Sequence, residues 1–323
     1  MTERKPTPEG VAAAAKRVSP HVVRTPLLPL DWAGQRLWVK AECLQEGGSF
    51  KLRGATNRLL LLSDSERERG VVAFSSGNHA QGVAIAARRL GIRATIVMPA
   101  DAPAVKLEAT RAAGAEIVAY DRATESREAI AAALAEARGA ALVPSFDDVD
   151  VIEGQGSVGI EIAEQLGAAP DKVLVPCGGG GLSAGIALAL PDSRLFTVEP
   201  EGWDDMSRSI AAGRPVPVEE PAPPTRCDAL QTKLVSALTL GALRDSGAVG
   251  LSVSEAEVDF AIAFAARHLR IVAEPGGAVA LAALLAGKAG EVSKRTVVVV
   301  SGGNVDPSLY AAILAAQAAE AER

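Results

Sequence analysis

The feature that most constrains this chain is a regular alternation of short apolar runs with amphipathic segments from about residue 70 onward. The apolar runs at 71–76, 93–99 and 115–121 are each followed by a segment in which apolar residues recur at helical spacing. Continuous apolar strands are typical of parallel sheets that helices cover on both faces. The pattern therefore predicts an α/β fold with a doubly wound sheet.

A second series of strand and helix signals begins near residue 151. It includes an apolar strand at 172–176 and another that ends near residue 200. The segment at 214–226 is rich in proline and acidic residues, so it predicts a loop. Further helices and a last strand within 295–304 complete the series.

Composition excludes several classes of protein. The 323 residues are 48% hydrophobic and 22% charged, which is typical of a globular, soluble protein. The formal net charge of −6 disfavours a nucleic-acid partner. The longest apolar runs, such as 278–286, are too short to span a bilayer, and the N-terminus lacks the apolar core of a signal peptide. We therefore expect no membrane partner.

The cysteines and histidines argue against disulfide bonds and against a zinc site. Cys43, Cys177 and Cys227 are odd in number and far apart, which disfavours a disulfide framework and indicates a reducing, cytoplasmic location. The three histidines form no HExxH motif, and no CxxC motif is present, so a zinc site is not expected.

A glycine-rich turn, CGGGGLSAG at 177–185, lies between a predicted strand and a predicted helix. Consecutive glycines leave backbone N–H groups free to form an anion cradle at a helix N-terminus. The turn lacks the Gly-Lys-Ser/Thr of a Walker A loop, and Ser183 stands where the dinucleotide motif G-x-G-x-x-G needs its last glycine, although Glu199 imitates the ribose-binding acid of that motif. The four cradle positions are Gly178, Gly179, Gly180 and Gly181.

Two functions from other classes compete at this point. Residues 181–185 match G-x-S-x-G, the nucleophile elbow of serine hydrolases, and His268 lies downstream. A nucleotide-binding regulatory module is the other alternative. The hydrolase reading leaves both the preceding glycines and Lys51 without a role.

Two more turns follow apolar strands. At 75–82, SSGNHAQG presents backbone and side-chain donors at the start of a helix, which suits a carboxylate. SGGNVD at 301–306 is the other such turn. Because all of these turns follow strands, they should lie at the carboxyl ends of the strands, where open α/β sheets bind ligands.

Lys51, within GGSFKLRGA at 47–55, completes the set. Helix-compatible residues resume at Leu52, so Lys51 lies near a helix N-terminus, where the helix dipole disfavours a cation. A lysine, a phosphate cradle and a carboxylate turn are together the parts of a pyridoxal-phosphate site. In such a site the lysine forms a Schiff base and the cradle holds the phosphate.

At this point the chain resembles the threonine/serine dehydratases and serine racemases among the fold type II pyridoxal-phosphate enzymes. The stretches that carry the resemblance occur in family order over nearly the whole chain, at 47–55, 75–82, 146–157, 175–185, 273–278 and 301–306. The resemblance implies a tryptophan-synthase-β-like fold with two doubly wound sheet domains and the cofactor between them. It also implies a large domain of 1–68 and 147–323, a small mobile domain of 69–146, and a homodimer.

The resemblance implies roles at matching positions. Lys51 would anchor pyridoxal 5'-phosphate and take the Cα proton of the substrate. Phe50 would pack against the cofactor ring, Asn78 would meet the ring hydroxyl, and Ser301 the pyridine nitrogen. The full cofactor set is Phe50, Lys51, Asn78, Gly178, Gly179, Gly180, Gly181, Leu182, Glu274 and Ser301. The substrate carboxylate would be surrounded by Ser75, Ser76, Gly77 and His79, with Ser76 as the acid on the opposite face, as in racemases.

The stretch VEPEGWDD at 198–205 is similar to the divalent-metal loop of the racemase branch. The similarity implies Glu199 and Asp205 as carboxylate ligands and Trp203 as a ligand through its carbonyl. Oxygen ligands suit Mg²⁺ or Ca²⁺.

The chain departs from the family pattern at CDALQT (227–232), where Ala229 replaces a glycine near the ring. This replacement concerns the substrate pocket. The regulatory domain of biosynthetic threonine dehydratases has no counterpart in the 323 residues, so feedback control by an end product is not expected.

The function that these features imply is dehydration of small β-hydroxy amino acids, such as L-threonine or L-serine, to a 2-oxo acid and ammonia. Racemisation of serine is the close alternative. Threo-3-hydroxyaspartate is another substrate, which needs a cation for its second carboxylate, and Arg127 and Arg53 are the candidates. Cysteine synthases are disfavoured because they usually carry an acid where this chain has Leu52.

Overall fold

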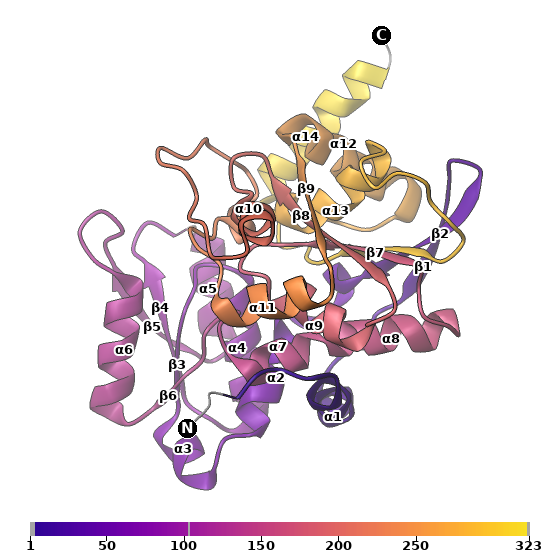
Figure 1. The fold of residues 1–323 in the computed structure, drawn as a ribbon. Helices are drawn as coiled ribbons and strands as arrows, with labels where there is room; N and C mark the ends of the chain where they lie inside the picture. The colour runs from indigo at the N-terminus through magenta and orange to yellow at the C-terminus, as the bar shows by residue number, and fades with distance from the viewer. Residues whose placement is uncertain (1–3, 103, 322–323) are drawn as a thin grey trace.

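Two sheets wound with helices organise the chain in a computed structural model that describes residues 4–102 and 104–321 (Figure 1). The larger sheet has the order β1-β2-β10-β7-β8-β9 and the smaller β5-β4-β3-β6. The larger sheet comprises β1 (Leu27–Trp32), β2 (Gln35–Ala41), β10 (Thr296–Val300), β7 (Lys172–Pro176), β8 (Arg194–Pro200) and β9 (Val249–Val253). The smaller comprises β5 (Glu116–Tyr120), β4 (Ala94–Pro99), β3 (Val71–Phe74) and β6 (Ala141–Leu142).

Helices connect and cover these strands. In chain order they are α1 (Pro8–Val18), α2 (Lys51–Leu60), α3 (Asp64–Arg69), α4 (Asn78–Leu90), α5 (Ala104–Ala112), α6 (Arg127–Arg138), α7 (Val149–Gln155), α8 (Ser157–Leu166), α9 (Gly181–Ala189), α10 (Asp205–Ala212), α11 (Ala237–Asp245), α12 (Glu255–Phe264), α13 (Pro275–Leu285) and α14 (Pro307–Ala321). Every residue of β4 and of β10 is buried, as expected for strands covered on both faces.

The doubly wound α/β fold predicted from the alternating pattern is confirmed. The strands of the smaller sheet pair in parallel, and all of them lie between residues 71 and 142. The domain limits at 68/69 and 146/147 stay a prediction. The loop predicted at 214–226 is also found, since no helix or strand occupies it.

The larger sheet holds one pair of strands that the pattern did not predict. β1 pairs with β2 in antiparallel register, so this sheet is mixed. Both turn residues have positive φ, 51° at Ala33 and 72° at Gly34, as a two-residue hairpin of primed type requires. The sequence does carry a sign of this hairpin, since two partly apolar runs flank Ala33 and Gly34. In these runs apolar and polar residues alternate, whereas the pattern used above to predict buried parallel strands is a continuous apolar run.

A buried network of four charges ties α2 to the larger sheet. Arg53 donates from Nε to Glu42 Oε2 at 2.7 Å and from Nη1 to Glu161 Oε1 at 2.7 Å. Lys40 donates from Nζ to Glu161 Oε2 at 2.6 Å. The side chains of Arg53, Lys40 and Glu42 have no exposed surface, so the two positive and two negative charges compensate one another inside the protein.

This network corrects one expectation. Arg53 was a candidate for the second carboxylate of threo-3-hydroxyaspartate, but its guanidinium is fully engaged and buried beneath α2. The carboxylates around it hold the pKa of Arg53 above its ordinary value, although burial alone would lower it. Its position therefore makes it a structural residue that supports the first turn of α2.

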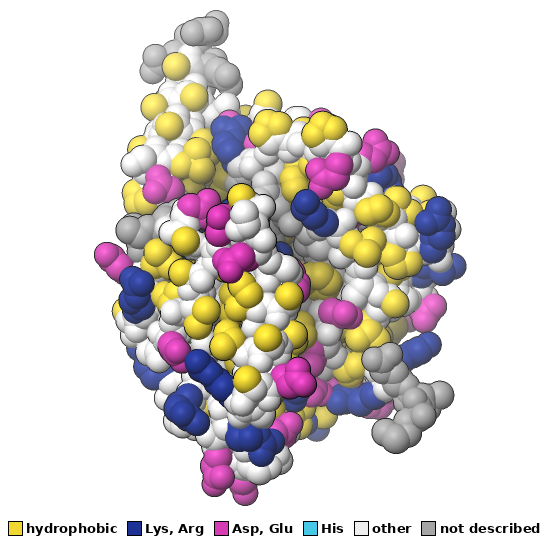
Figure 2. Space-filling view, turned by 90° about the vertical axis from the view of Figure 1, so that its left-hand side faces the viewer, with side chains coloured by type: hydrophobic (Ala, Val, Ile, Leu, Met, Phe, Trp, Pro, Cys, Tyr) yellow, Lys and Arg dark blue, Asp and Glu magenta, His cyan; other side chains and the backbone are white. Residues whose placement is uncertain are grey.

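Charged side chains of both signs intermingle on the face shown in Figure 2, where no continuous basic surface is visible. This arrangement agrees with the net charge of −6. Within residues 4–102 and 104–321, no helix combines the length and the apolar character that crossing a bilayer requires.

We expect Arg53→Leu to lower the free energy of unfolding by about 3–5 kcal/mol, because it leaves Glu42 and Glu161 buried with one cation between them. Urea unfolding followed by circular dichroism measures the change. Arg127→Leu, at a side chain that is 43% exposed, serves as the matched control and should cost less than about 1 kcal/mol. Equal effects of the two substitutions would contradict the role of the network.

Candidate active site

The first and last of the sequence motifs meet in backbone pairing. The Phe50 N–H donates to the Ser301 carbonyl at 3.2 Å, and the Gly303 N–H donates to the Gly48 carbonyl at 2.9 Å. Ser49 and Gly302 form an antiparallel bridge between these two contacts. The start of α2 is therefore held against the carboxyl end of β10.

Lys51 is the first residue of α2, as predicted. Its Nζ donates to the Ser145 carbonyl at 2.9 Å and lies 5.1 Å from the centre of the Phe50 ring. Although the residue keeps some exposed surface, desolvation of its amine lowers the pKa of Lys51 to about 8. An amine with this pKa is partly neutral near physiological pH, which is the form that attacks an aldehyde or accepts a proton.

The four glycines form a turn that leaves little room for side chains. Gly180 caps α9 with φ of 86°, and a Cβ there would lie 2.5 Å from Met206 Cε. A Cβ at Gly179 would lie 2.3 Å from the ring of Phe146. Bare backbone thus reaches the N-terminus of α9, a helix of nine residues, where N–H groups and the helix dipole favour a phosphate.

Asn78 and Glu274 come together beside Gly302, in the turn that follows β10. Asn78 Nδ2 donates to Glu274 Oε1 at 2.5 Å, and Asn304 Nδ2 donates to Asn78 Oδ1 at 2.8 Å. A Cβ at Gly302 would lie 2.0 Å from Glu274 Oε1, so glycine follows Ser301 because the carboxyl group occupies that space. Burial first, and then the charge of Asp228, raises the pKa of Glu274 to about 7.

The SSGN turn lies at the carboxyl end of β3. Ser75 N–H donates to the Val97 carbonyl at 3.2 Å, and Ser75 Oγ accepts from the Gly77 N–H at 3.1 Å. A Cβ at Gly77 would meet no atom within 4 Å, so the turn borders open space. Ser75, Ser76 and Gly77 are partly exposed, which leaves them accessible to a small ligand.

His79 is placed differently from its neighbours. Its ring lies 2.8 Å from the Val143 carbonyl through Nε2, and only 2% of the residue is exposed. Burial, assisted by the charge of Lys51, lowers the pKa of His79 to about 3, so the imidazole is neutral. With Nε2 donating to Val143, Nδ1 has no proton to offer a carboxylate.

Residues 143–146, for most of which the sequence predicted no role, contact three parts of the site. Residues 143–146 supply the carbonyl of Val143 to His79, the carbonyl of Ser145 to Lys51, and the ring of Phe146 to Gly179. Asn304 was likewise missed, because SGGNVD was read only for its serine. Phe146 and Asn304 belong to stretches that carry the resemblance, at 146–157 and 301–306, which was the available signal, whereas residues 143–145 belong to none of them.

The features that suggested a hydrolase are separated. Ser183 is fully buried inside α9, where its Oγ lies 3.4 Å from the Pro176 carbonyl. His268 instead stacks on Phe264, with ring centres 4.3 Å apart, beyond the end of α12. Glu199, which imitated a ribose-binding acid, accepts from the Met206 and Ser207 amides at 2.8 Å.

The acids of the suggested metal loop are buried near each other. Neither carboxylate oxygen of Asp205 makes a hydrogen bond of normal geometry to a described residue, although the main-chain amides of Asp205 and Val235 face it. Burial raises the pKa of Asp205 to about 7, and burial together with the charge of Asp205 raises that of Glu199. Trp203 Nε1 donates to the Pro223 carbonyl at 2.8 Å. The atom of Trp203 that the similarity implies as a metal ligand is its main-chain carbonyl oxygen.

No group of three or more His, Cys, Asp or Glu side chains suited to a metal occurs within residues 4–102 and 104–321. A cation here would therefore depend on two carboxylates completed by backbone carbonyls and water. Unpartnered buried oxygens of this kind do fit a hard divalent cation.

The turn at residues 228–230 accommodates alanine at position 229, where the family pattern has glycine. Among the described residues only Ala33 and Arg270 combine a side chain with positive φ, so the backbone at 229 does not require glycine. Its turn, Asp228–Leu230, lies close to Gly276 and Gly178. Alanine therefore imposes no left-handed backbone strain on this turn.

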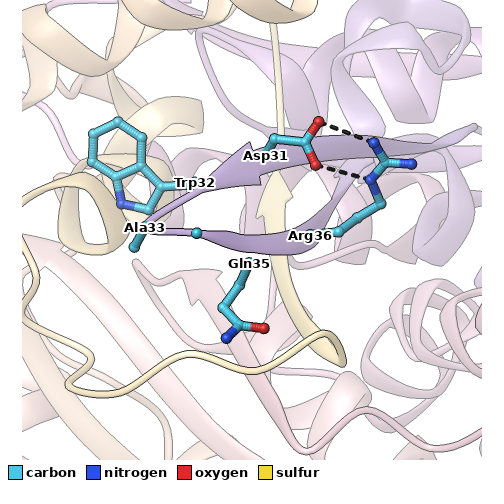
Figure 3. Close-up of a pocket in the computed structure, with 6 residues that line it drawn as sticks. Asp31, Trp32, Ala33, Gln35 and Arg36 are labelled. Carbon is cyan, nitrogen blue, oxygen red and sulfur yellow. Dashed lines mark hydrogen bonds and ion pairs between the residues drawn. The ribbon is translucent and has the colours of Figure 1, made fainter.

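A separate open pocket of about 410 Å³ surrounds the β1–β2 turn, from Asp31 to Arg36 (Figure 3). Arg36 bonds to Asp31 through Nε and Nη2 at 2.9 and 3.0 Å. β2 starts at this turn and runs parallel to β10, so the pocket lies at the edge opposite to the glycine turns. It takes no part in the site described above.

Comparison with known proteins agrees with this arrangement. The family model described as pyridoxal-phosphate dependent enzyme matches residues 18–303, and the chain belongs to this family. An L-threo-3-hydroxyaspartate ammonia-lyase from a Pseudomonas species is 44% identical over 94% of this chain and 97% of its own.

Two solved structures share the whole fold. Maize serine racemase superposes with a TM-score of 0.90 at 34% identity, over 99% of this chain and 100% of its own. The processed form of threonine deaminase isoform 2 from Solanum lycopersicum superposes with a TM-score of 0.88 at 33% identity, over 96% of this chain and 94% of its own. The expected fold type II architecture is confirmed, and the family implies pyridoxal phosphate.

We expect borohydride reduction of the holoenzyme to fix the cofactor to Lys51, because its buried amine has a lowered pKa and bonds to a carbonyl rather than to a carboxylate. Tryptic mapping of the reduced protein identifies the modified lysine. Lys51→Ala should lose the visible absorbance of the bound cofactor and at least about a hundredfold of the elimination rate. Label on a different lysine would contradict the assignment.

Proposed function

We propose that this protein is an ammonia-lyase for β-hydroxy amino acids, with L-threo-3-hydroxyaspartate as its preferred substrate and L-serine and L-threonine as slower ones. The observation that supports the reaction is the buried amine of Lys51, with a pKa of about 8, at the edge that also carries the SSGN turn. The preference for a dicarboxylate is supported by the similarity to a hydroxyaspartate ammonia-lyase.

Each group of the site has one task in this proposal. Bound pyridoxal phosphate would withdraw electrons from the substrate Cα, with its phosphate held by Gly178–Gly181 and Leu182. The turn at Ser75–Gly77 would hold the α-carboxylate. Lys51 would then take the Cα proton, the β-hydroxyl would leave as water, and hydrolysis of the released enamine would give a 2-oxo acid and ammonia.

Phe50, Asn78, Glu274 and Ser301 would hold the ring in this proposal. Phe50 lies next to Lys51 in sequence and within 5.1 Å of its amine, so its ring lines the same space. Asn78 has its orientation set by Glu274 and Asn304 before any ligand arrives. A preset orientation reduces the reorganisation that binding requires.

Ser76 separates lyase activity from racemisation. Elimination needs one base on the lysine side, whereas racemisation needs a second acid on the opposite face of Cα. We expect Ser76→Ala to reduce racemisation of serine at least about a hundredfold and to keep L-substrate dehydration within about threefold. Deuterium incorporation into recovered serine and the yield of 2-oxo acid measure the two activities.

Wild-type protein that racemises serine faster than it produces 2-oxo acid would overturn the proposed lyase. Equal loss of both activities in Ser76→Ala would assign this serine to substrate binding. A substrate panel of threo-3-hydroxyaspartate, serine and threonine ranks the preferences by kcat/KM.

We further propose that Glu199, Asp205 and the Trp203 carbonyl bind Mg²⁺ or Ca²⁺. Because the pKa of Asp205 is raised from 3.8 to about 7, the protein without a cation loses stability as the pH rises from about 4 to about 7, and above pH 7 the carboxylate is ionised at that full cost. A cation binds the ionised form, so its stabilising effect should appear above pH 7 and fade as the pH falls.

Added Mg²⁺ or Ca²⁺ should therefore raise the melting temperature at about pH 8 by several degrees and far less at about pH 6. Asp205→Asn should remove the increase at both values. Differential scanning calorimetry with and without chelator measures it. No change on chelation at the higher pH would show that the two acids serve only the fold.

A further inference from the structure

An ion pair joins the two halves of the fold next to the site. Lys106 Nζ, near the start of α5, donates to Asp228 Oδ2 at 2.5 Å. α5 packs with the smaller sheet, whereas Asp228 begins the 3-10 turn Asp228–Leu230 in the loop that follows α10. In Figure 1 that loop approaches α5 from the side of the larger sheet. The contact therefore crosses between the halves.

The turn that carries Asp228 lies against the cofactor site. A Cβ at Gly178 would be 3.2 Å from Leu230 Cα, and a Cβ at Gly276 would be 3.4 Å from that of Ala229. The charges of the pair also reach Glu274, since Asp228 raises and Lys106 lowers its pKa. The pair is thus close enough to act on a ligand in the site.

α5 also lies at the correct edge of the smaller sheet. It follows β4, and β4 pairs in parallel with β3, whose carboxyl end carries the SSGN turn. Parallel neighbours end at the same edge, so the first turn of α5 and the SSGN turn are adjacent. A ligand whose α-carboxylate is held by that turn would place a group on its β-carbon near Lys106.

Other cations near the smaller sheet have different partners. Arg127 bonds to Glu128 and lies over the Phe74 ring, 5.6 Å from its centre. Among the described residues Lys106 has one ion-pair partner, Asp228, whose side chain is 53% exposed, and an exposed carboxylate is readily exchanged for another. The pair is therefore suited to open for a competing anion.

We infer that Lys106 is a specificity-determining residue, which binds the second carboxylate of a short dicarboxylate substrate in exchange for Asp228. This inference rests on the proposed function. A monocarboxylate such as serine leaves the Lys106–Asp228 pair intact. A four-carbon dicarboxylate takes the place of Asp228, and Asp228 acts as its internal competitor.

The exchange has a signature that a purely structural contact lacks. Lys106→Gln should weaken dicarboxylate binding, and Asp228→Asn should strengthen it, because the competitor loses its charge. If the pair only held the two halves together, both substitutions would weaken binding of every ligand. The opposite signs distinguish the two cases.

Binding to the holoenzyme tests the inference without turnover. Succinate has the chain length and both carboxylates of the substrate, and butyrate keeps the chain length with one carboxylate. Titration followed by cofactor absorbance and by melting temperature gives the Kd of each. We expect Lys106→Gln to raise the Kd of succinate about tenfold or more, with butyrate changed less than about twofold.

Asp228→Asn should lower the Kd of succinate at least about threefold and should have no effect in the Lys106→Gln background, because the two residues act through one contact. Lys106→Arg should restore most of the binding. Arg111→Gln removes one positive charge from the last turn of the same helix and serves as the matched control, with unchanged Kd.

Two results would overturn the inference: a loss of succinate binding in both Lys106→Gln and Asp228→Asn, or a loss confined to Arg127→Gln. The proposed function fails separately, if wild-type protein turns over no β-hydroxy amino acid. The KM for threo-3-hydroxyaspartate should follow the Kd of succinate in each variant, whereas the KM for serine should stay constant.

Discussion

The backbone contact between residues 48–50 and residues 301–303 is the constraint on which the site depends. It joins the start of α2 to the end of β10, two segments separated by most of the chain. From one side it places the Lys51 amine, and from the other it places Gly302 against Glu274. Since these contacts use main-chain atoms, they hold the geometry while the side chains stay free for chemistry.

Ionisable groups inside the protein fall into two kinds. Arg53, Lys40, Glu42 and Glu161 are paired at hydrogen-bonding distance, so burial leaves them charged. Within the described part of the chain, Lys51 bonds only to a carbonyl and Asp205 makes no hydrogen bond of normal geometry, so burial shifts the pKa of each toward its neutral form. Groups of the second kind are costly to the fold and useful to catalysis, and strongly shifted pKa values are typical of functional sites.

Much of this arrangement could be predicted from the sequence. Continuous apolar strands identified the doubly wound sheets, the turns after those strands placed Asn78 and the glycine cradle at carboxyl ends, and the helix signal placed Lys51 at a helix start. The β1–β2 hairpin was not predicted, because apolar and polar residues alternate in its strands and its pairing depends on positive φ at Ala33 and Gly34.

Other features depend on contacts between distant residues. The sequence offers no local sign that Arg53 is paired with Glu42 and Glu161, which lie 11 and 108 positions away. The same holds for the ring of Phe146 against Gly179 and for the His79 ring against Val143. The burial and the partners of these side chains depend on tertiary packing, which a local sequence pattern does not report.

The chain passes between the two sheets twice, and the two passages differ. The first, through α3, has no buried residue and is stabilised by its own capping box. The second, residues 143–146, is bonded to His79 and Lys51 and lies against Gly179. Any rotation of the smaller sheet that pivots on the first passage would draw the Ser145 carbonyl away from Lys51. Separation of the two sheets and release of the amine would then occur in one movement.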